Sequence, residues 1–241
     1  MNEALPDHIF NGSAVTTDAS LPNVQLDRLW TLQKGMKDFG VSLDRPMRFL
    51  VLYGSIRKQS YSRYLAEEAM RLLIAMGAEV KTFDPRELPT PADGTDSHPR
   101  VRDLQDLSHW ADGHVWVSPE LHGLMSSVLK LQLEHLPLMA EDMQPTRGRT
   151  LAVMQVSGGS QSFNCLNQMR VLGRWLHMIS VPYHCSLPEV SDKFDGNGRM
   201  KPGAKYDRVV DVLEQLVKFT LLLQGRTDLL LDYYSERVIK V

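Results

Sequence analysis

The stretch MRFLVLYGSIRKQSYSR, residues 47–63, decides the fold class of this 241-residue chain. Its first seven residues are apolar apart from Arg48 and are followed by Gly54, as in a buried strand that runs into a loop. Beyond the loop, apolar residues recur at helical spacing from Ser62 to Met76, and Gly77 stands where helices commonly end. A buried strand, a polar loop and a helix in this order indicate the first unit of an α/β protein.

The same alternation continues along the rest of the chain. We expect further strands and helices, in turn, at 78–83, 101–112, 114–117, 126–135, 150–156, 170–177, 179–183 and 206–224. Because right-handed crossovers place helices above and below a parallel sheet, this order predicts a doubly wound, five-stranded parallel sheet with helices on both faces.

The ends of the chain differ from this regular centre. Residues 1–45 lack a sustained period apart from a weakly helical stretch at 27–39, and we interpret them as an N-terminal arm. Residues 226–241 are interpreted as a C-terminal arm, which leaves one domain at 46–225. The proline-rich segment 84–100 is long enough to be a functional flap.

Composition excludes several classes of protein. The chain is 43% hydrophobic and 23% charged, with a formal net charge of −2, so it offers no basic surface for nucleic acid or anionic lipid. Cys165 and Cys185 show no metal-ligand spacing, and neither do the histidines. No apolar run has the length of a signal peptide or a membrane span. We expect a cytoplasmic protein without a metal site and without nucleic-acid or membrane partners.

The first candidate site is the loop at 54–63. Ligands of doubly wound sheets bind beyond the carboxyl ends of the strands, and a helix start with serines and arginines favours a phosphate. A terminal monophosphate fits best, because the glycine patterns for a dinucleotide or a nucleoside triphosphate are absent. In the alternative interpretation, Ser60 or Ser62 only caps the helix and the arginines are solvated. The candidate residues are Ser55, Arg57, Ser60, Tyr61, Ser62 and Arg63.

Two later loops complete the candidate site. The loop at 118–125 can present backbone amides and a flat apolar surface to an isoalloxazine ring. The adjacent glycines at 157–162 permit positive φ, so their N–H groups can form a nest for negative charge near flavin N1 and O2. A surface turn and a flexible turn are the respective alternatives. The candidate residues are Pro119, Glu120, Leu121, His122, Gly123, Ser157, Gly158, Gly159, Ser160 and Gln161.

These loops resemble those of the NADPH-dependent FMN reductase family, and within it the arsenical-resistance flavoproteins of the ArsH group. The resemblance rests on 53–63, on 118–123 and most specifically on LAVMQVSGGSQSFNCLNQMRVLGR at 151–174. It implies a flavodoxin-like strand order 2-1-3-4-5, bound FMN, NADPH as electron donor and a homotetramer. It also implies a ping-pong cycle in which flavin, quinone, azo dye, ferric iron or oxygen takes the electrons, and a role in organoarsenical resistance.

Some residues depart from the family pattern or remain open. Leu121 and Leu133-Glu134-His135 are departures, so ring orientation or acceptor preference can differ from the relatives. Cys165 is interpreted as a core residue. Arg170 and Arg174 fit either the 2′-phosphate of NADPH or a salt bridge between subunits. No side chain is predicted as an acid, base or nucleophile, and the alternative function is a non-catalytic electron carrier or redox sensor.

Overall fold

The computed structural model describes residues 20–137, 144–234 and 237, and within them helices alternate with strands as predicted. The helices and strands are α1 (Leu32–Phe39), β1 (Arg48–Tyr53), α2 (Tyr61–Ala75), β2 (Glu79–Thr82), α3 (Pro99–Trp110), β3 (Gly113–Leu121), β4 (Leu124–Met125), α4 (Ser127–Glu134), β5 (Thr150–Val156), α5 (Asn164–Trp175), β6 (Ile179–Ser180), β7 (Cys185–Leu187), α6 (Ala204–Leu223) and α7 (Thr227–Leu230). Two short 3₁₀ helices lie at Thr95–Ser97 and Val190–Lys193.

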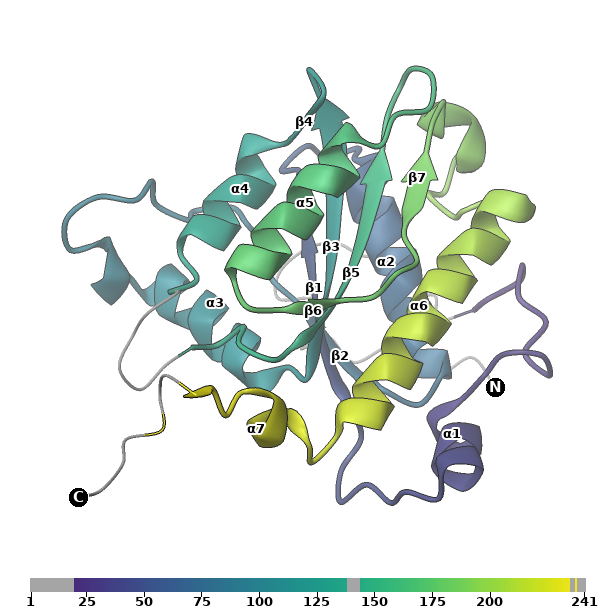
Figure 1. Ribbon diagram of the computed structural model, residues 1–241. Coiled ribbons are helices and arrows are strands. Elements are labelled where there is room, and N and C mark those ends of the chain that lie inside the picture. Colours follow the sequence, from purple (N-terminus) through teal and green to yellow (C-terminus); the bar gives the residue numbers. More distant parts are fainter. Residues whose placement is uncertain (1–19, 138–143, 235–236, 238–241) are drawn as a thin grey trace.

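The centre of the molecule is a parallel sheet in the order β2-β1-β3-β5-β6, and β7 also pairs with β5 (Figure 1). All pairs along this path are parallel, and only β4 is antiparallel, to β3. Counted over the parallel strands alone, this order is the predicted 2-1-3-4-5, with the fifth place shared by β6 and β7. The predicted doubly wound fold is therefore confirmed.

The fifth strand is interrupted, whereas the sequence pattern predicted a continuous strand at 179–183. In β6, Ser180 lies opposite Leu151, and the amide of Val181 still donates to the Leu151 carbonyl at 2.9 Å. The amides of Ile179 and Val181 point towards β5, so the next amide in line is that of Tyr183, and it donates to the Gln215 side chain at 2.7 Å instead. Pairing with β5 therefore stops after Val181 and resumes at Cys185 in β7.

Strand β3 is longer than the predicted 114–117 and forms a hairpin with β4. Pro119 still lies opposite Val156 of β5, although proline within a run argues against a strand. His122 and Gly123 then take φ values of 52° and 74°, as a two-residue hairpin turn with a left-handed conformation requires. The predicted loop at 118–125 is therefore mostly strand and tight turn.

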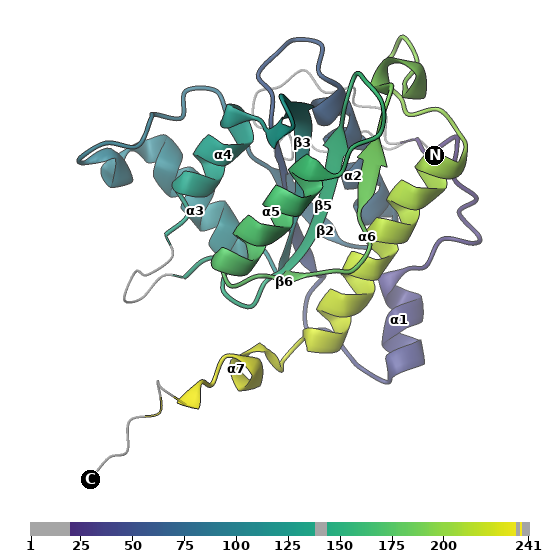
Figure 2. The ribbon, with the colours of Figure 1, turned by 45° about the horizontal axis from the view of Figure 1, so that its top comes forward.

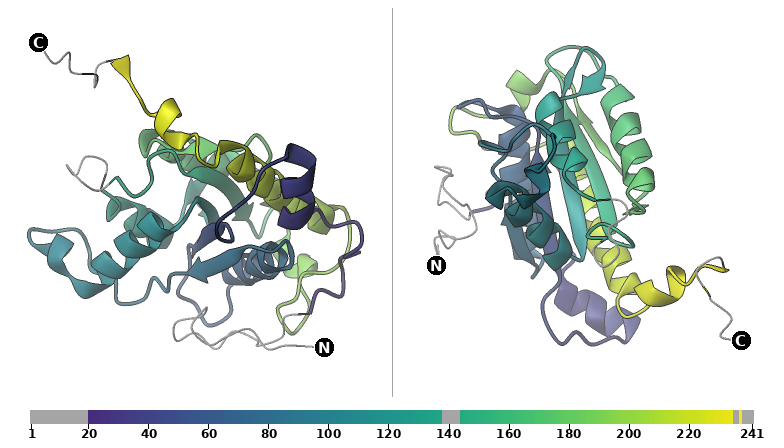
Figure 3. Two further views of the ribbon diagram at one scale, coloured as in Figure 1. Left: turned by 90° about the horizontal axis from the view of Figure 1, so that it is seen from below. Right: turned by 90° about the vertical axis from the view of Figure 1, so that its left-hand side faces the viewer.

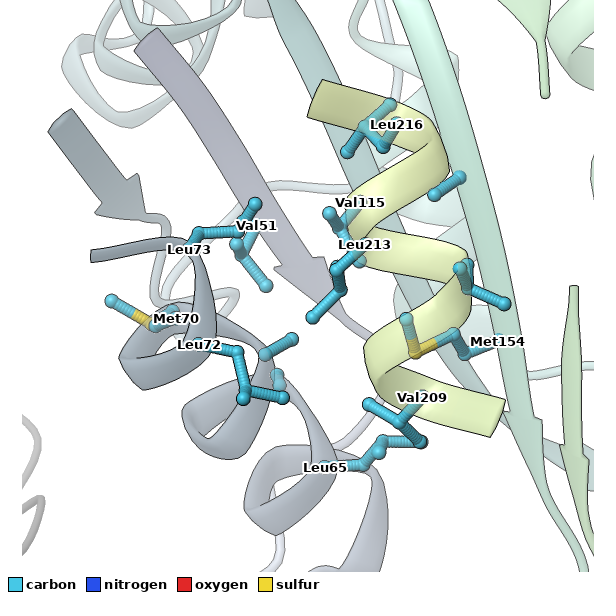
Figure 4. Packing of buried hydrophobic residues seen from close by; sticks show 14 of the residues in the cluster. Val51, Leu65, Met70, Leu72, Leu73, Val115, Met154, Val209, Leu213 and Leu216 are labelled. Atoms are coloured by element: carbon cyan, nitrogen blue, oxygen red, sulfur yellow. The ribbon is translucent and has the colours of Figure 1, made fainter. Parts of the chain in front are cut away.

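Two hydrophobic clusters hold the layers together, one on each face of the sheet. Figure 3 shows the helices that cover the two faces. One cluster joins the sheet to α1, α2 and α6, and the other joins it to α3, α4 and α5. Figure 4 shows the first cluster, in which Leu73 of α2 and Leu213 of α6 face Val51 of β1. Because β1 is buried on both faces, it supplies apolar side chains to both clusters, as its unbroken apolar run predicted.

The N-terminal segment packs on this core through α1, which lies beside α6 (Figures 1 and 2). Trp30 and Leu32 are buried, and the Leu32 amide donates to the Met76 carbonyl at 2.8 Å. The predicted weak helix at 27–39 is thus shorter, beginning after the Thr31 cap. Parts of both predicted arms, 1–19 and 235–236 with 238–241, lie outside the described residues, and the limits at 46 and 225 stay a prediction.

A buried histidine in β3 links the stability of the fold to pH. The Trp116 indole N–H donates to Nδ1 of His114 at 3.3 Å, and the other ring nitrogen lies 3.3 Å from the Ser108 hydroxyl. Burial lowers the pKa of His114 to about 3, with a weaker contribution from Arg149. The imidazole therefore stays neutral in the folded protein, whereas the unfolded chain binds a proton near its ordinary pKa of 6.5.

This difference predicts a specific loss of stability in acid. Because the folded-state pKa lies below the unfolded value, the free energy of unfolding falls as the pH drops below 6.5 towards 3. Between pH 7.5 and 5.0 the wild type should lose about 2 kcal/mol more than His114→Gln, measured by urea unfolding with saturating cofactor. His109→Gln, at an exposed position on α3, is the control and should follow the wild type. If the free energy of unfolding fell equally with pH in the wild type and in His114→Gln, the buried neutral state of His114 would be contradicted.

Candidate functional site

A cavity of about 420 Å³ lies beyond the carboxyl ends of the central strands, where the three predicted loops meet. The predicted site residues that line it are Ser55, Arg57, Ser60, Tyr61, Ser62, Pro119, Glu120, Leu121, Ser157 and Gly158. Gly54, Ile56 and Gln59, which belong to the predicted first loop but were not named as candidates, also line it. The lining further contains residues outside the predicted loops, namely Ser126, Ser127, Val128, Val156, Val190 and Ser191. Arg63, His122, Gly123, Gly159, Ser160 and Gln161 do not line it.

The first loop is fixed by the start of α2. Ser60 is the N-cap, because its hydroxyl accepts a hydrogen bond from the Arg63 amide at 3.2 Å, and it also lies 3.0 Å from the Ser62 hydroxyl. Both serines are buried and line the cavity. The cap thus satisfies the Arg63 amide, whereas the amides of Tyr61 and Ser62 have no acceptor inside the helix and can donate to an anion. Capping by Ser60 is therefore compatible with an anion at this helix start.

The two arginines of this loop have different surroundings. Arg57 lines the cavity, and across the described parts of the chain its guanidinium makes no ion pair or hydrogen bond. Arg63 instead donates to the Lys58 carbonyl at 2.7 Å and lies 3.3 Å from a carboxylate oxygen of Glu67. Arg63 therefore closes the loop on itself, and Arg57 is the cation available to a phosphate.

Gly54 brings the first two loops into contact. A β-carbon at this position would lie 2.4 Å from the Ser126 hydroxyl and 3.0 Å from Cδ of Pro119, which is too close for any side chain. The Ser126 hydroxyl donates to the Gly54 carbonyl at 2.8 Å and caps α4 by accepting from the Leu129 amide. The start of α4 is thus attached directly to the end of β1, and Ser126 joins the cavity lining.

Gln155 connects the second and third loops. Its fully buried side chain donates to a carboxylate oxygen of Glu120 at 2.9 Å and to the Ser162 carbonyl at 2.7 Å. Its amide oxygen accepts from the Leu166 backbone at 3.0 Å. One side chain at the end of β5 therefore positions the end of β3, the 157–162 loop and the first turn of α5.

The third loop differs in conformation from the expected anion nest. Neither Gly158 nor Gly159 has a positive φ, so the left-handed nest predicted from these glycines does not form. A β-carbon at either position would meet no atom within 4 Å, which leaves open space beside the loop. The Ser157 hydroxyl is buried and has no hydrogen-bond partner among the described residues. This hydroxyl is therefore available to form a hydrogen bond with a ligand in the cavity.

Besides the three loops, the segment after β7 also lines the cavity, through Val190 and Ser191. Buried charges hold this segment in place, because Arg199 at its far end binds Glu68. Glu68 of α2 accepts from Arg199 at 3.2 Å and from Arg71 at 2.9 Å through one carboxylate oxygen. Its other oxygen accepts from the Tyr206 hydroxyl at 2.7 Å. This network ties α2, the helix that follows the first loop, to the segment with Val190 and Ser191 and to α6.

These features fit FMN. The unpaired Arg57 guanidinium, the Ser62 hydroxyl and the amides of Tyr61 and Ser62 suit its phosphate. Pro119 and Leu121 offer apolar surface to the ring, and the Ser157 hydroxyl can donate to a ring oxygen. A buried hydroxyl without a partner and an unpaired cation in the lining of one cavity suit a ligand that carries acceptors for both.

Cys165 and His135 are structural by position. Cys165 is fully buried, and burial raises the pKa of its thiol to about 11, so it remains a neutral core residue as predicted. His135, one of the departures from the family pattern, is buried, and its Nε2 lies 2.7 Å from the Pro89 carbonyl. It therefore anchors the 84–100 segment to α4.

Comparison with known proteins assigns the chain to a family. The model of the family described as NADPH-dependent FMN reductase matches residues 47–192. The chain belongs to this family. As a member, it is a flavin-dependent oxidoreductase that uses FMN and NADPH, as the resemblance implied.

Individual relatives agree with the family assignment. The chain is 54% identical over 217 residues to the NADPH-dependent FMN reductase ArsH of Rhizobium meliloti, covering 90% of each chain. It is 56% identical over 194 residues to the protein of the same name from Acidithiobacillus ferrooxidans, covering 80% of this chain and 82% of the relative. In structure it resembles the flavoenzyme FerB of Paracoccus denitrificans, with a TM-score of 0.58 and 20% identity over 73% of this chain and 98% of FerB.

In the part of the chain that the structure describes, no three histidine, cysteine or carboxylate side chains are grouped so as to hold a metal ion. The helices described there are also too short or too polar to cross a membrane.

The site geometry predicts a dominant role for Arg57 in cofactor retention. Since a hydrogen bond to a charged phosphate contributes about 1.5–3 kcal/mol, Arg57→Ala should raise the Kd for FMN at least about tenfold. Fluorescence quenching during titration of apoprotein with FMN measures this Kd. Lys58→Ala removes the neighbouring exposed cation, which does not line the cavity, and should bind FMN as the wild type does. Unchanged affinity in Arg57→Ala would exclude the phosphate from this loop.

Proposed function

We propose that the cavity holds FMN and that the chain passes electrons from NADPH, in a ping-pong sequence, to a small-molecule acceptor. The observation that carries this proposal is the presence of an unpaired Arg57 guanidinium and an unpartnered, buried Ser157 hydroxyl in the lining of one cavity. The chemistry that FMN supplies there is acceptance of a hydride from NADPH and delivery of two electrons to the second substrate.

The chain's own residues bind and position in this proposal. Arg57 and Ser62 hold the phosphate, and Gln155 keeps Glu120 and the 157–162 loop in place around the ring. The Ser157 hydroxyl donates to the edge of the ring that gains negative charge, which favours electron uptake. No described side chain has to act as an acid, a base or a nucleophile in this sequence.

The acceptor range follows from the rim of the cavity. Leu121 and Tyr61 line the cavity and are partly exposed, so they offer apolar contacts that do not select one acceptor. Flavin, quinone, azo dye, ferric iron and oxygen are the proposed acceptors. Extensive similarity to relatives named ArsH supports a role in organoarsenical resistance. The use of NADPH, together with two unpaired cysteines, supports action in the cytoplasm.

The rival function is an electron carrier or redox sensor with the same fold, and one experiment separates the two. Under nitrogen, NADPH should bleach the yellow FMN-loaded protein within seconds, and admission of air should restore the colour. Absorbance near the flavin maximum in a stopped-flow cell measures both steps. Free FMN with NADPH, without protein, is the control. A protein that keeps its FMN but stays oxidised with NADPH would support the carrier and contradict the enzyme.

We further propose that the chain forms a homotetramer. The support is an exposed apolar surface on the β3–β4 hairpin and α5, in which Leu124, Val171 and Trp175 are each more than half exposed. Beside it runs an apolar groove of about 600 Å³ between β4, α4 and α5, which Met125 and Leu172 also line. Contiguous exposed apolar surface of this kind marks a contact surface between proteins.

A charge placed on this surface should therefore change the assembly. Trp175→Glu is expected to convert tetramers into smaller species, because burying an unpaired carboxylate in an apolar contact is costly. Size-exclusion chromatography with light scattering gives the mass. Leu26→Glu, which alters an exposed apolar residue of the N-terminal segment, should remain tetrameric. A wild-type monomer at micromolar concentration would contradict the homotetramer itself.

A further inference from the structure

A second group of residues with binding chemistry lies outside the cavity, between α5 and α6. We call it the α5–α6 patch, and its members are Phe163, Arg170, Tyr183, His184 and Arg208. Figures 1 and 2 show β7 and the chain that leads into it running between these two helices. The cavity lining contains none of the five residues.

The patch combines exposed aromatic rings with positive charge. Phe163 and Tyr183 are 45% and 44% exposed. The Phe163 ring stands edge-on to the His184 ring, with the two centroids 5.8 Å apart. The Arg208 guanidinium lies over the Tyr183 ring, 4.8 Å from its centroid. Rings in these positions are held by neighbours from other elements, yet each keeps an open surface.

The positive charge of the patch is not compensated by carboxylates. Arg170 and Arg208 are exposed, and in the described segments neither forms an ion pair or a hydrogen bond. Both are close enough to His184 to contribute, after burial, to the lowering of its pKa. In addition, Nδ1 of His184 is buried without a hydrogen-bond partner. Unpaired cations beside an unpartnered ring nitrogen form an environment suited to an anion that also donates or accepts hydrogen bonds.

The patch begins where the third loop of the cavity ends. Phe163 follows Ser162 directly and is the residue before α5. The Ser162 carbonyl accepts from Gln155 at 2.7 Å and from the Ser186 hydroxyl at 2.9 Å. The same anchor therefore fixes the loop beside the flavin ring and the first aromatic residue of the patch. A long ligand that starts at the ring can continue over this loop to the patch.

We propose that the α5–α6 patch binds the adenosine 2′-phosphate of NADPH and selects NADPH over NADH. Arg170 and Arg208 provide forked donors to the doubly charged phosphate, and the exposed rings offer faces for the adenine. NADH carries a hydroxyl at this position and gains nothing from the two guanidinium groups. This inference rests on the proposed use of NADPH as electron donor, and it assigns specificity to Arg170 together with a residue of α6.

Kinetics with two donors test the assignment. In the full-length, FMN-loaded double variant Arg170→Ala/Arg208→Ala, KM for NADPH should rise at least about tenfold, since two charge-assisted contacts are lost. KM for NADH and kcat with either donor should remain those of the wild type. Arg102→Ala, an exposed arginine on α3, is the control and should change neither KM. Equal changes for NADPH and NADH, or none, would overturn the proposal.

Binding of fragments gives a readout that is independent of turnover. By calorimetry, the FMN-loaded wild type should bind adenosine 2′,5′-bisphosphate at least about tenfold more tightly than 5′-AMP, and the double variant should lose this preference. A preference that survives in the double variant would place the 2′-phosphate elsewhere. If that preference survives and NADPH bleaches the flavin of the wild type, the proposed function stands while this inference fails. A wild type that NADPH does not bleach would instead remove the proposed function.

Discussion

The site depends on the close contact between Gly54, which has no side chain, and the start of α4. Parallel strands bring their carboxyl ends to one edge of the sheet, but the loops there meet only if nothing separates them. At Gly54 the missing β-carbon leaves room for the Ser126 hydroxyl and the Pro119 ring. The loop at 54–63 and the end of β3 are thereby joined, and Gln155 adds the third loop to them.

Polar groups of the site that are bonded within the protein have structural roles, whereas groups without a partner are available to a ligand. Arg63 and Ser60 make hydrogen bonds within the protein, whereas the Arg57 guanidinium and the Ser157 hydroxyl make none across the described residues. The same distinction separates Cys165, a buried neutral thiol, from Arg170 of α5 and Arg208 of α6, which are exposed. A flavoenzyme of this kind needs few reactive side chains, because the cofactor carries the redox chemistry and the chain supplies charge, shape and position.

Much of this arrangement could be predicted from the sequence, for identifiable reasons. Strand β5 was predicted with its observed limits, since seven buried residues in a row leave a clear pattern. The β3–β4 hairpin was missed because Pro119 argues against a strand. The break in the edge strand was missed because the Tyr183 amide donates to Gln215, a tertiary contact that local sequence does not reveal. Side-chain direction, which separates Arg57 from Arg63, and the wall formed by Val190 come from tertiary contacts that local patterns do not encode.

The network around Glu68 has a consequence for the response of the enzyme to ionic strength. Its charges are buried, so dissolved ions scarcely screen them, and the distance between α2 and the wall that carries Val190 does not depend on salt. The Arg57 guanidinium faces an open cavity, where counterions compete with a phosphate. High salt would thus lower the affinity for the proposed FMN while leaving the shape of the cavity intact. Once the salt is removed, the apoprotein could bind FMN again.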